Sequence, residues 1–324
     1  MLEIGYKLSS EEHGPRDLVR NARMAEDAGF SFALISDHYH PWIDTQGQSP
    51  FAWCVIGGIA QTTERLGLGT GVTCPTVRIH PAIIAQAAAT AAAMMPGRFF
   101  LGLGTGENLN EHVVGPGWPE TEIRQERLKE AVEVIRLLWQ GGNQSHHGTH
   151  FTVENARIYT LPETLPPIML AVGGPRTAEA AARIADGMVG TGSEPETLER
   201  FEAAGGAGKP RYGELTVCWA KDQKQARRTA HQWWPTSAME SSLSWELPLP
   251  KHFEDVAKLV TEDAVAESIT CGPDVEKHVQ AIEKYARAGY DHVCIHQIGP
   301  DQGGFIRFYE KQVLPRLEKL KTAA

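Results

Sequence analysis

Short apolar runs and helical patterns alternate along almost the whole chain, and this alternation is the feature that most restricts its fold. The apolar runs are continuous, which is typical of parallel strands covered on both faces. Eight β-then-α units in 324 residues predict an α/β fold, a single (β/α)8 TIM barrel, rather than two nucleotide-binding halves. The runs expected to form strands are 3–8, 32–35, 66–72, 99–104, 168–172, 187–190, 214–219 and 292–298.

Segments with helical periodicity follow most of these runs. Their apolar residues recur three or four positions apart, which is the spacing of a helix that packs one face against a sheet. The expected helices are 15–28, 51–62, 81–95, 123–139, 177–184, 196–204, 274–288 and 303–320.

Two intervals interrupt the alternation and are predicted to be insertions in one domain of residues 1–324. Polar residues dominate from about 140 to 167, where 150–153 and 156–159 have the pattern of a small hairpin. The interval from about 231 to 267 contains three of the eight tryptophans and is too long for a plain connection. We expect this Trp-rich interval to form a lid or a pocket wall.

The composition restricts the partners and the compartment. A net charge of −9 disfavours nucleic acid as a partner. The longest apolar stretch, 83–95, is mostly alanine and too short for a membrane span, and the first residues lack a signal-peptide pattern. Five widely spaced cysteines, an odd number, argue against a disulfide framework and against a structural zinc site. We therefore expect a cytoplasmic protein with no membrane partner.

The segment after the second predicted strand carries the strongest chemical signal. Asp37, His38 and Trp42 follow the apolar run 32–35 within a few positions. Ligands of parallel α/β proteins bind at the carboxyl ends of the strands, so polar residues there are expected to be functional. An imidazole at this place can exchange a proton with a substrate hydroxyl near neutral pH. The other interpretation of His38 is a structural histidine at a strand end.

A glycine-rich segment, 102–106, follows the fourth predicted strand and directly precedes Glu107. Its G-x-G-x-G spacing does not fit the dinucleotide-binding fingerprint, which needs a βαβ unit and an acidic residue downstream. Small residues here would let a flat ring approach the backbone while Glu107 donates or accepts a proton. A solvated loop carboxylate is the other interpretation of Glu107.

The segment 173–177, Gly-Gly-Pro-Arg-Thr, follows the fifth predicted strand and begins a helix. Free N–H groups, the positive end of a helix dipole and the guanidinium of Arg176 together suit a phosphate. A plain turn with a solvent-facing Arg176 is the alternative. At the end of the third predicted strand, Gly71 precedes the β-branched Val72, and this pair permits a bulge or an unusual peptide geometry.

Four motifs together resemble one family: Ser36-Asp-His-Tyr-His-Pro-Trp42, Leu68-Gly-Thr-Gly-Val-Thr-Cys-Pro-Thr76, 102–111 and Val172-Gly-Gly-Pro175. Nearly from end to end, the chain is similar to the luciferase-like barrel oxidoreductases that use the deazaflavin coenzyme F420, in the branch of F420-dependent glucose-6-phosphate dehydrogenase. The resemblance implies a luciferase-like barrel, a homodimer and coenzyme F420. It also implies hydride transfer between a substrate hydroxyl or carbonyl carbon and C5 of the coenzyme.

The resemblance also implies residue roles. His38 and Glu107 resemble the acid–base pair, with the two roles left open, and Trp42 resembles the aromatic wall of the hydride-transfer site. The peptide 71–72 falls where the family has a non-proline cis bulge behind the deazaflavin. Cys74 stands where the sugar-phosphate enzymes have a coenzyme-contacting threonine. The implied coenzyme-binding positions are Asp37, Gly71, Val72, Cys74, Thr105, Gly106, Asn110, Gly173, Gly174, Arg176 and Thr177.

The residues expected to border the substrate depart from the sugar-phosphate pattern. The resemblance places Trp42, Thr191 and Glu194 there, and Glu194 occupies the position of a phosphate-binding lysine. Ala266 stands in the place of an arginine, and 242–244 lacks a second lysine. Charge-assisted phosphate contacts contribute about 1.5–3 kcal/mol each. A small neutral alcohol, or the corresponding ketone, is therefore expected as substrate instead of glucose 6-phosphate.

Three other functions remain open. One is an F420-dependent sugar-6-phosphate dehydrogenase, and another is an FMN-dependent luciferase-like monooxygenase, against which the F420-type motifs count. The third is a metal-dependent barrel hydrolase. It is disfavoured because no matching set of ligands falls at the strand ends in between, so no metal site is predicted. Its candidate ligands would be His38, His40, His292, His296 and Asp301.

Overall fold

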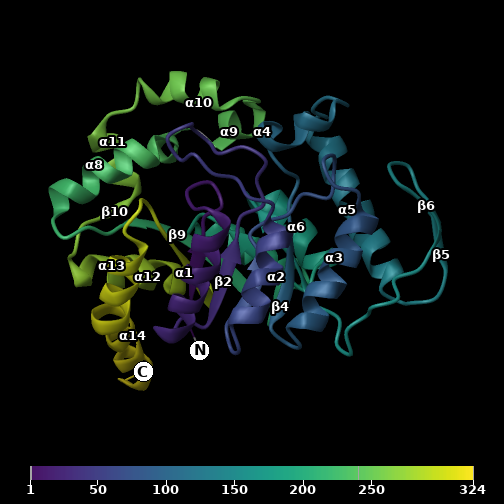
Figure 1. The fold of residues 1–324 in the computed structure, drawn as a ribbon, viewed down its shortest axis with the longest axis horizontal. Helices are drawn as coiled ribbons and strands as arrows, with labels where there is room; N and C mark the ends of the chain where they lie inside the picture. Colours follow the sequence, from purple (N-terminus) through teal and green to yellow (C-terminus); the bar gives the residue numbers. More distant parts are fainter. Residues whose placement is uncertain (1, 240, 324) are drawn as a thin grey trace.

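The computed structural model describes residues 2–239 and 241–323. Its central element is a closed barrel of eight parallel strands, which confirms the predicted (β/α)8 fold (Figure 1). Neighbouring strands follow the order β9-β11-β1-β2-β3-β4-β7-β8, and the pairing of β8 with β9 closes the ring. The barrel strands are β1 (Glu3–Leu8), β2 (Phe32–Ile35), β3 (Gly67–Thr70), β4 (Phe99–Leu103), β7 (Ile168–Val172), β8 (Gly187–Gly190), β9 (Arg211–Cys218) and β11 (His292–Gln297).

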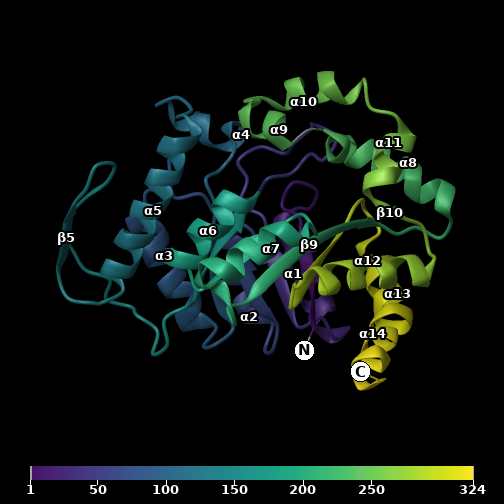
Figure 2. The same ribbon diagram turned by 180° about the vertical axis from the view of Figure 1, so that it is seen from behind.

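Helices surround the barrel, as Figures 1 and 2 show from opposite sides. The longer helices are α1 (Pro15–Asp27), α2 (Ala52–Thr62), α3 (Pro81–Met94), α5 (Thr121–Leu138), α6 (Pro175–Ile184), α8 (Gln223–Trp233), α12 (Val275–Ala288) and α14 (Leu314–Ala323). The shorter ones are α4 (Asn108–Glu111), α7 (Pro195–Phe201), α9 (Ser241–Glu246), α10 (Pro250–Ala257), α11 (Glu262–Ser268) and α13 (Gln302–Phe308). In Figure 1, α4, α9 and α10 lie together above the barrel.

Strand β2 shows how the apolar runs build the core, because all its residues are buried. Phe32 and Leu34 belong to the cluster that fills the barrel interior. Ala33 and Ile35 belong to the larger cluster that joins the outer barrel wall to the helices. A Cβ atom at Gly5 of the neighbouring strand would lie 2.4 Å from the Phe32 ring, so glycine there leaves room for the ring. Two-sided burial is what a continuous apolar run predicts.

The strand bounds agree with the prediction where a run is short and bounded by turn residues. β1, β2, β7 and β8 have the predicted bounds, whereas β3 ends at Thr70, before the predicted end at Val72. β9 begins at Arg211 rather than at Glu214, because Arg211 and the two residues after it pair with β8. That pairing closes the barrel, and no pattern within residues 211–213 predicts it.

The hairpin of the first insertion is formed by segments other than the predicted ones. β5 (Gln144–His147) pairs with β6 (Thr152–Ala156), so the prediction of strands at 150–153 and 156–159 is wrong. The turn is held by Glu130 of α5, whose carboxylate accepts the N–H of His150 at 3.0 Å and of Phe151 at 2.8 Å. This contact with α5 places the turn between residues 147 and 152, before the position that the sequence pattern of the hairpin predicts.

The Trp-rich interval 231–267 is largely helical in the part that the structure describes. It contains the end of α8, the 3-10 turn Pro235–Ala238, and α9, α10 and most of α11, and β10 (Thr270–Cys271) follows as a short extra strand beside β9. The predicted terminal helix is interrupted by a π turn, Tyr309–Val313, between α13 and α14. Among the described residues, no helix combines the length and the apolar character that crossing a bilayer needs.

Candidate active site

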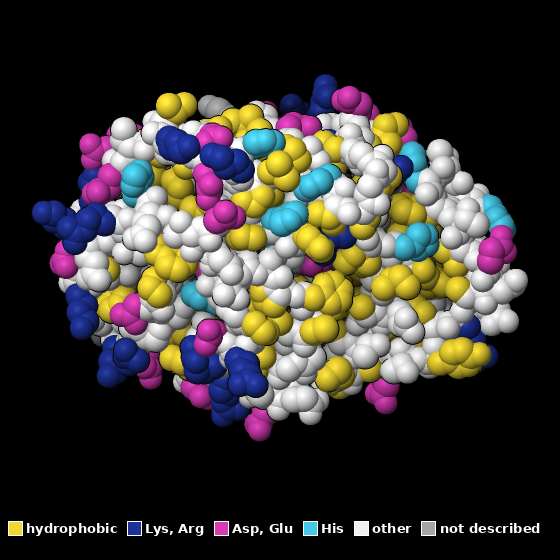
Figure 3. Space-filling model, turned by 45° about the horizontal axis from the view of Figure 1, so that its top comes forward, with side chains coloured by type: hydrophobic (Ala, Val, Ile, Leu, Met, Phe, Trp, Pro, Cys, Tyr) yellow, Lys and Arg dark blue, Asp and Glu magenta, His cyan; other side chains and the backbone are white. Residues whose placement is uncertain are grey.

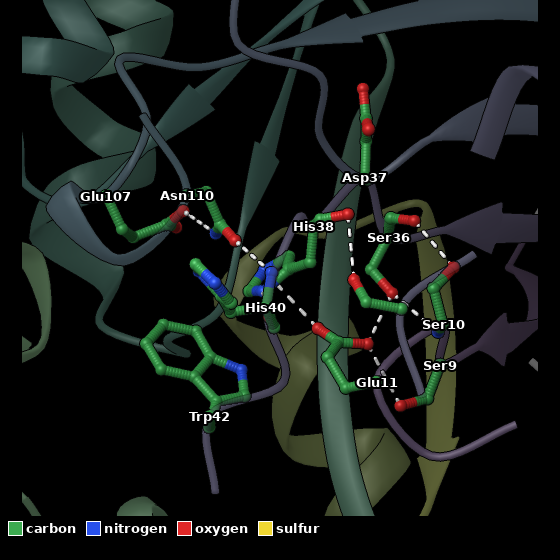
Figure 4. Close-up of polar contacts among 12 residues, drawn as sticks. Ser9, Ser10, Glu11, Ser36, Asp37, His38, His40, Trp42, Glu107 and Asn110 are labelled. Carbon is green, nitrogen blue, oxygen red and sulfur yellow. Dashed lines mark hydrogen bonds and ion pairs between the residues drawn. The ribbon is translucent and has the colours of Figure 1, made fainter. Parts of the chain in front are cut away.

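His38 follows the carboxyl end of β2 and lies between a carboxylate and an indole (Figure 4). Its Nε2 is 3.3 Å from Oε1 of Glu11, and its Nδ1 is 3.2 Å from the carbonyl oxygen of His40. Its ring centre lies 5.1 Å from that of Trp42, with the planes at 60°. Both ring nitrogens face oxygen acceptors, so the imidazole is held in place from two sides.

Glu11 is a functional candidate that the sequence analysis did not predict. Its buried carboxylate accepts hydrogen bonds from the hydroxyls of Ser36 at 2.6 Å and Ser9 at 3.1 Å. Burial alone would raise the pKa of Glu11, but His38, Lys7 and the Ser36 hydroxyl lower it to about 2. Glu11 is therefore a fixed anion beside His38. Its position just after β1, at the same end of the barrel as His38, is the sequence feature that could have indicated a functional residue.

Substitution of Glu11 by glutamine is expected to lower kcat by about 10²-fold, because the imidazole loses the charge that orients it. It should also lower the free energy of unfolding at pH 7. The folded-state pKa of Glu11 lies below the ordinary value of 4.5, so this stabilisation is present above pH 4.5 and is lost as the pH falls toward about 2. Urea unfolding of both proteins between pH 7 and pH 3 tests this. A stability difference that persists undiminished at pH 3 would contradict it.

Glu107 is half-buried on the loop after β4 and is tied to the His38 loop through Asn110. The amide nitrogen of buried Asn110 donates to Oε2 of Glu107 at 3.2 Å. Its amide oxygen accepts the N–H groups of Tyr39 at 2.9 Å and His40 at 3.2 Å. The structure thus joins the loops that carry His38 and Glu107. Asn110 was expected to bind the coenzyme, and these contacts give it a structural task in addition.

Asp37 points away from His38 in Figure 4. Its buried carboxylate accepts the hydroxyl of Thr73 at 2.7 Å and pairs with Arg78 at 2.9 Å. Arg78 also lies 3.4 Å from the carboxylate of Glu111. Burial raises the pKa of Glu111 to about 7, although Arg78 acts in the opposite direction. The structure therefore does not bring the Asp37 carboxylate together with His38, and a coenzyme contact of Asp37 stays a prediction.

The loops after β3 and β4 pack tightly against each other. The peptide bond between Gly71 and Val72 is cis, and the Gly71 carbonyl oxygen accepts a hydrogen bond from Nζ of Lys7 at 2.8 Å. Cys74 is buried, burial raises the pKa of its thiol, and its Sγ lies 3.0 Å from the Thr76 hydroxyl. A Cβ atom at Gly106 would lie 2.6 Å from Cys74 Sγ, so only glycine fits this close approach. Thr105, also expected to bind coenzyme, contributes its carbonyl oxygen to Thr76 at 3.3 Å.

The turn 173–177 after β7 begins helix α6. The N–H groups of Gly173 and Gly174 donate to the Thr177 hydroxyl oxygen at 3.1 and 3.2 Å. The helix therefore caps its own N-terminus, while Arg176 beside it is exposed. A cation next to the positive end of a helix still fits an anion at this turn. Thr191 and Glu194, the other expected substrate contacts, are exposed on the segment after β8.

A second buried ionic group lies at the same barrel end and was also missed. Lys7 pairs with Glu214 at 2.6 Å, and His296 pairs with Glu12 at 3.1 Å. The ring of Trp234 packs edge-on against His296 with ring centres 4.5 Å apart. These two pairs place compensated charges on β1, β9 and β11 and on the segment after β1.

The structure does not bring the candidate ligands of a metal hydrolase together in one site. His292 is at the amino end of β11, opposite to His38, and His296 is engaged by Glu12. Asp301 caps α13 by accepting the N–H of Gly304 at 2.8 Å. Within residues 2–239 and 241–323, no three His, Cys, Asp or Glu side chains are grouped so that they could hold a metal ion.

Comparison with known proteins agrees with this barrel. F420-dependent glucose-6-phosphate dehydrogenases from Microbacterium testaceum and Nocardia farcinica are 36% and 37% identical, over 98% of this chain and 98% and 99% of theirs. A solved F420-dependent secondary alcohol dehydrogenase in complex with an F420-acetone adduct is 30% identical, with a TM-score of 0.89 over 96% of this chain and 98% of that one.

More distant structures share the fold alone. A coenzyme F420-dependent tetrahydromethanopterin reductase from Methanopyrus kandleri is 22% identical with a TM-score of 0.76, over 97% of this chain and 99% of that one. The sequence pattern of the luciferase-like monooxygenase family matches residues 2–292. The chain therefore belongs to the luciferase-like monooxygenase family of barrel proteins.

Proposed function

We propose that this chain is an F420-dependent oxidoreductase that interconverts a neutral secondary alcohol and its ketone. The observation that carries the proposal is the pairing of His38 with Glu11 beside Trp42. Asn110 joins the loop that carries His38 to the loop that carries Glu107. Relatives 36% identical over nearly the whole chain are named as F420-dependent dehydrogenases. An FMN-dependent monooxygenase is the alternative in the same family, and copurification of a yellow flavin with oxygen consumption would favour it.

The residues present fit a flat deazaflavin with a phosphate. The turn after β7 leaves open space beside its backbone, since a Cβ atom at Gly174 would meet no atom within 4 Å. Arg176 and the N-terminus of α6 offer positive charge for the phosphate. The residues proposed to hold F420 are Asp37, Gly71, Val72, Cys74, Thr105, Gly106, Asn110, Gly173, Gly174, Arg176 and Thr177.

Bound F420 would supply a ring carbon, C5, that exchanges hydride with the substrate carbon. His38 would move the proton of the substrate oxygen: it gives the proton to a ketone in reduction and takes it from an alcohol in oxidation. In both oxidation and reduction, the Glu11 carboxylate would stabilise the His38 imidazole while that imidazole holds the proton. Glu107 would hold or deliver a proton at the coenzyme ring. Trp42 would exclude water from the reacting groups.

The charges at this barrel end favour a neutral substrate over a sugar phosphate. Lys7 is paired with Glu214, Arg78 with two carboxylates, and Arg124 with Glu246. Glu194, expected beside the substrate, adds a negative charge. A phosphate bound there would lose the charge-assisted contacts that contribute about 1.5–3 kcal/mol each. The names of the curated relatives favour the sugar phosphate, so glucose 6-phosphate is the second candidate.

The test is to mix the purified protein with oxidised F420 and follow the loss of its visible absorbance. We expect turnover with 2-propanol or other neutral secondary alcohols. With glucose 6-phosphate we expect kcat/KM at least about 100-fold lower, as the loss of two phosphate contacts or more implies. Faster turnover of glucose 6-phosphate would contradict the substrate class. Failure to bind F420 would contradict the proposed function itself.

We also propose a homodimer formed through the outer faces of α2 and α3. The segments 51–63 and 81–95 contain no Asp, Glu, Lys or Arg, although both helices are on the outside of the barrel. Trp53, Ile83 and Met94 line a groove between the two helices, and Ile83 is 57% exposed. An uncharged, largely apolar helix face is normally buried, and a second copy of the same face would bury this one.

The substitution Ile83→Glu is therefore expected to convert a dimer into a monomer, because it places a charge in an apolar contact. Light scattering coupled to size-exclusion chromatography measures the mass. The wild-type protein should have twice the 35.5 kDa mass of one chain, and the variant the mass of one. Leu259→Glu, at a site 83% exposed after α10, is the matched control and should stay dimeric. A monomeric wild-type protein would contradict the proposal.

We propose further that residues 1–324 act as one domain with insertions at about 140–167 and 231–267. All five cysteines are free, four of them buried. Free thiols suit a reducing compartment, so we propose a cytoplasmic location.

A further inference from the structure

Helix α9, in the Trp-rich interval, is anchored beside the candidate catalytic loop. The carbonyl oxygen of Glu246 accepts a hydrogen bond from the side-chain amide of Asn108 at 2.9 Å. The Glu246 carboxylate lies 3.2 Å from the guanidinium of Arg124, which is buried. Asn108 directly follows Glu107, so these contacts fix the end of α9 one residue from a proposed proton-transfer group. Figures 1 and 2 show α9 next to α4.

Trp245, the residue before Glu246, reaches the turn after β7. A Cβ atom built on Gly173 would lie 3.3 Å from Cζ2 and 3.6 Å from Cη2 of Trp245. The six-membered edge of the indole therefore packs against Gly173, and the side chain is still 38% exposed. The end of α9 thus reaches the Glu107 loop through Glu246 and the glycine turn 173–174 through Trp245. These are the two segments proposed to hold opposite ends of the coenzyme.

The other two tryptophans of the interval have different surroundings. Trp234 packs against His296, and Trp233 packs against the apolar cluster of α8 and β10. Trp233 also borders a polar surface pocket with His13. The three tryptophans therefore have different neighbours. Trp245 alone of the three contacts the glycine turn.

We propose that Trp245 is a coenzyme-binding residue, whose indole covers the bound coenzyme between the glycine loop after β4 and the turn 173–177. This inference rests on the proposed function. An indole combines a large apolar face with an N–H donor, which suits a ligand that has a flat ring at one end and a phosphate at the other. Covering of the ligand by α9 would also exclude water from the adjacent Glu107.

The experiment is an equilibrium titration with oxidised F420, followed by quenching of tryptophan fluorescence and, independently, by ultrafiltration. Stacking on an aromatic side chain contributes about 1–3 kcal/mol, which is about 5- to 150-fold in affinity. Trp245→Ala is expected to weaken the Kd for F420 within this range. Trp245→Phe should largely retain affinity but lose part of the quenching. Leu243→Ala, equally exposed on the same helix, is the matched control and should bind like the wild type.

The outcomes separate this inference from the proposed function. Wild-type protein that fails to bind F420 refutes the proposed function, and with it the role of Trp245. If the wild type binds but Trp245→Ala binds equally well or more tightly, the inference alone is overturned. Equal weakening by Leu243→Ala would also overturn it, because the effect would then come from the packing of α9 and not from the indole.

Discussion

Substitution of His38 by alanine is expected to lower kcat by about 10²–10⁴-fold, the usual contribution of a positioned general acid or base. The Kd for F420 should change little, because His38 is held by Glu11 and a backbone carbonyl and is not among the proposed coenzyme-binding residues. Stopped-flow measurement of F420 absorbance at saturating alcohol separates the hydride-transfer rate from binding.

His40→Ala is the matched control for this prediction. The His40 ring lies on the same loop, but its Nδ1 is bonded to the Leu109 carbonyl oxygen at 2.8 Å rather than to a carboxylate. The control should retain kcat within a few-fold. Equal losses in both variants would mean that the loop has lost its structure, and full activity of His38→Ala would refute the acid–base role.

Glu107→Gln is expected to have the second-largest effect, a decrease in kcat of about 10²–10³-fold. Glutamine can still accept the hydrogen bond from Asn110, so the loop should keep its structure while the proton-carrying carboxyl group is lost. Circular dichroism and F420 binding should be unchanged.

Glu122→Gln serves as the control for the change in net charge, because Glu122 is an exposed carboxylate in the first turn of α5. It should leave kcat unaltered. A Glu107→Gln enzyme with the wild-type rate would show that Glu107 is a solvated loop carboxylate, the other interpretation of this residue.

The sequence predicts the barrel well because its strands are specified locally. The apolar runs at β2, β7 and β8 are bounded by turn residues, so their ends agree with the prediction. His38, Trp42 and Glu107 could be proposed from the sequence because the rule that ligands bind at the carboxyl ends of strands needs only the strand ends. The prediction misplaced the hairpin β5–β6 because the turn is fixed by Glu130, which lies outside the hairpin on α5.

Side-chain direction is the part that the sequence could not supply. Asp37 directly precedes His38, yet its carboxylate turns toward Thr73 and Arg78, which lie 36 and 41 residues away in the chain. Glu11 pairs with His38 although the two belong to different strand–helix units. Both orientations are decided by buried charge pairing between loops, and this has no periodic pattern that a single sequence reveals.

The most direct test of the central claim is a crystal structure of the protein with F420 bound. We expect the deazaflavin ring to lie at the carboxyl end of the barrel, in contact with Trp42 and within hydrogen-bonding reach of His38 or Glu107, with the phosphate at 173–177. A ring bound at any other surface, with His38 and Glu107 remote from it, would refute the proposed site.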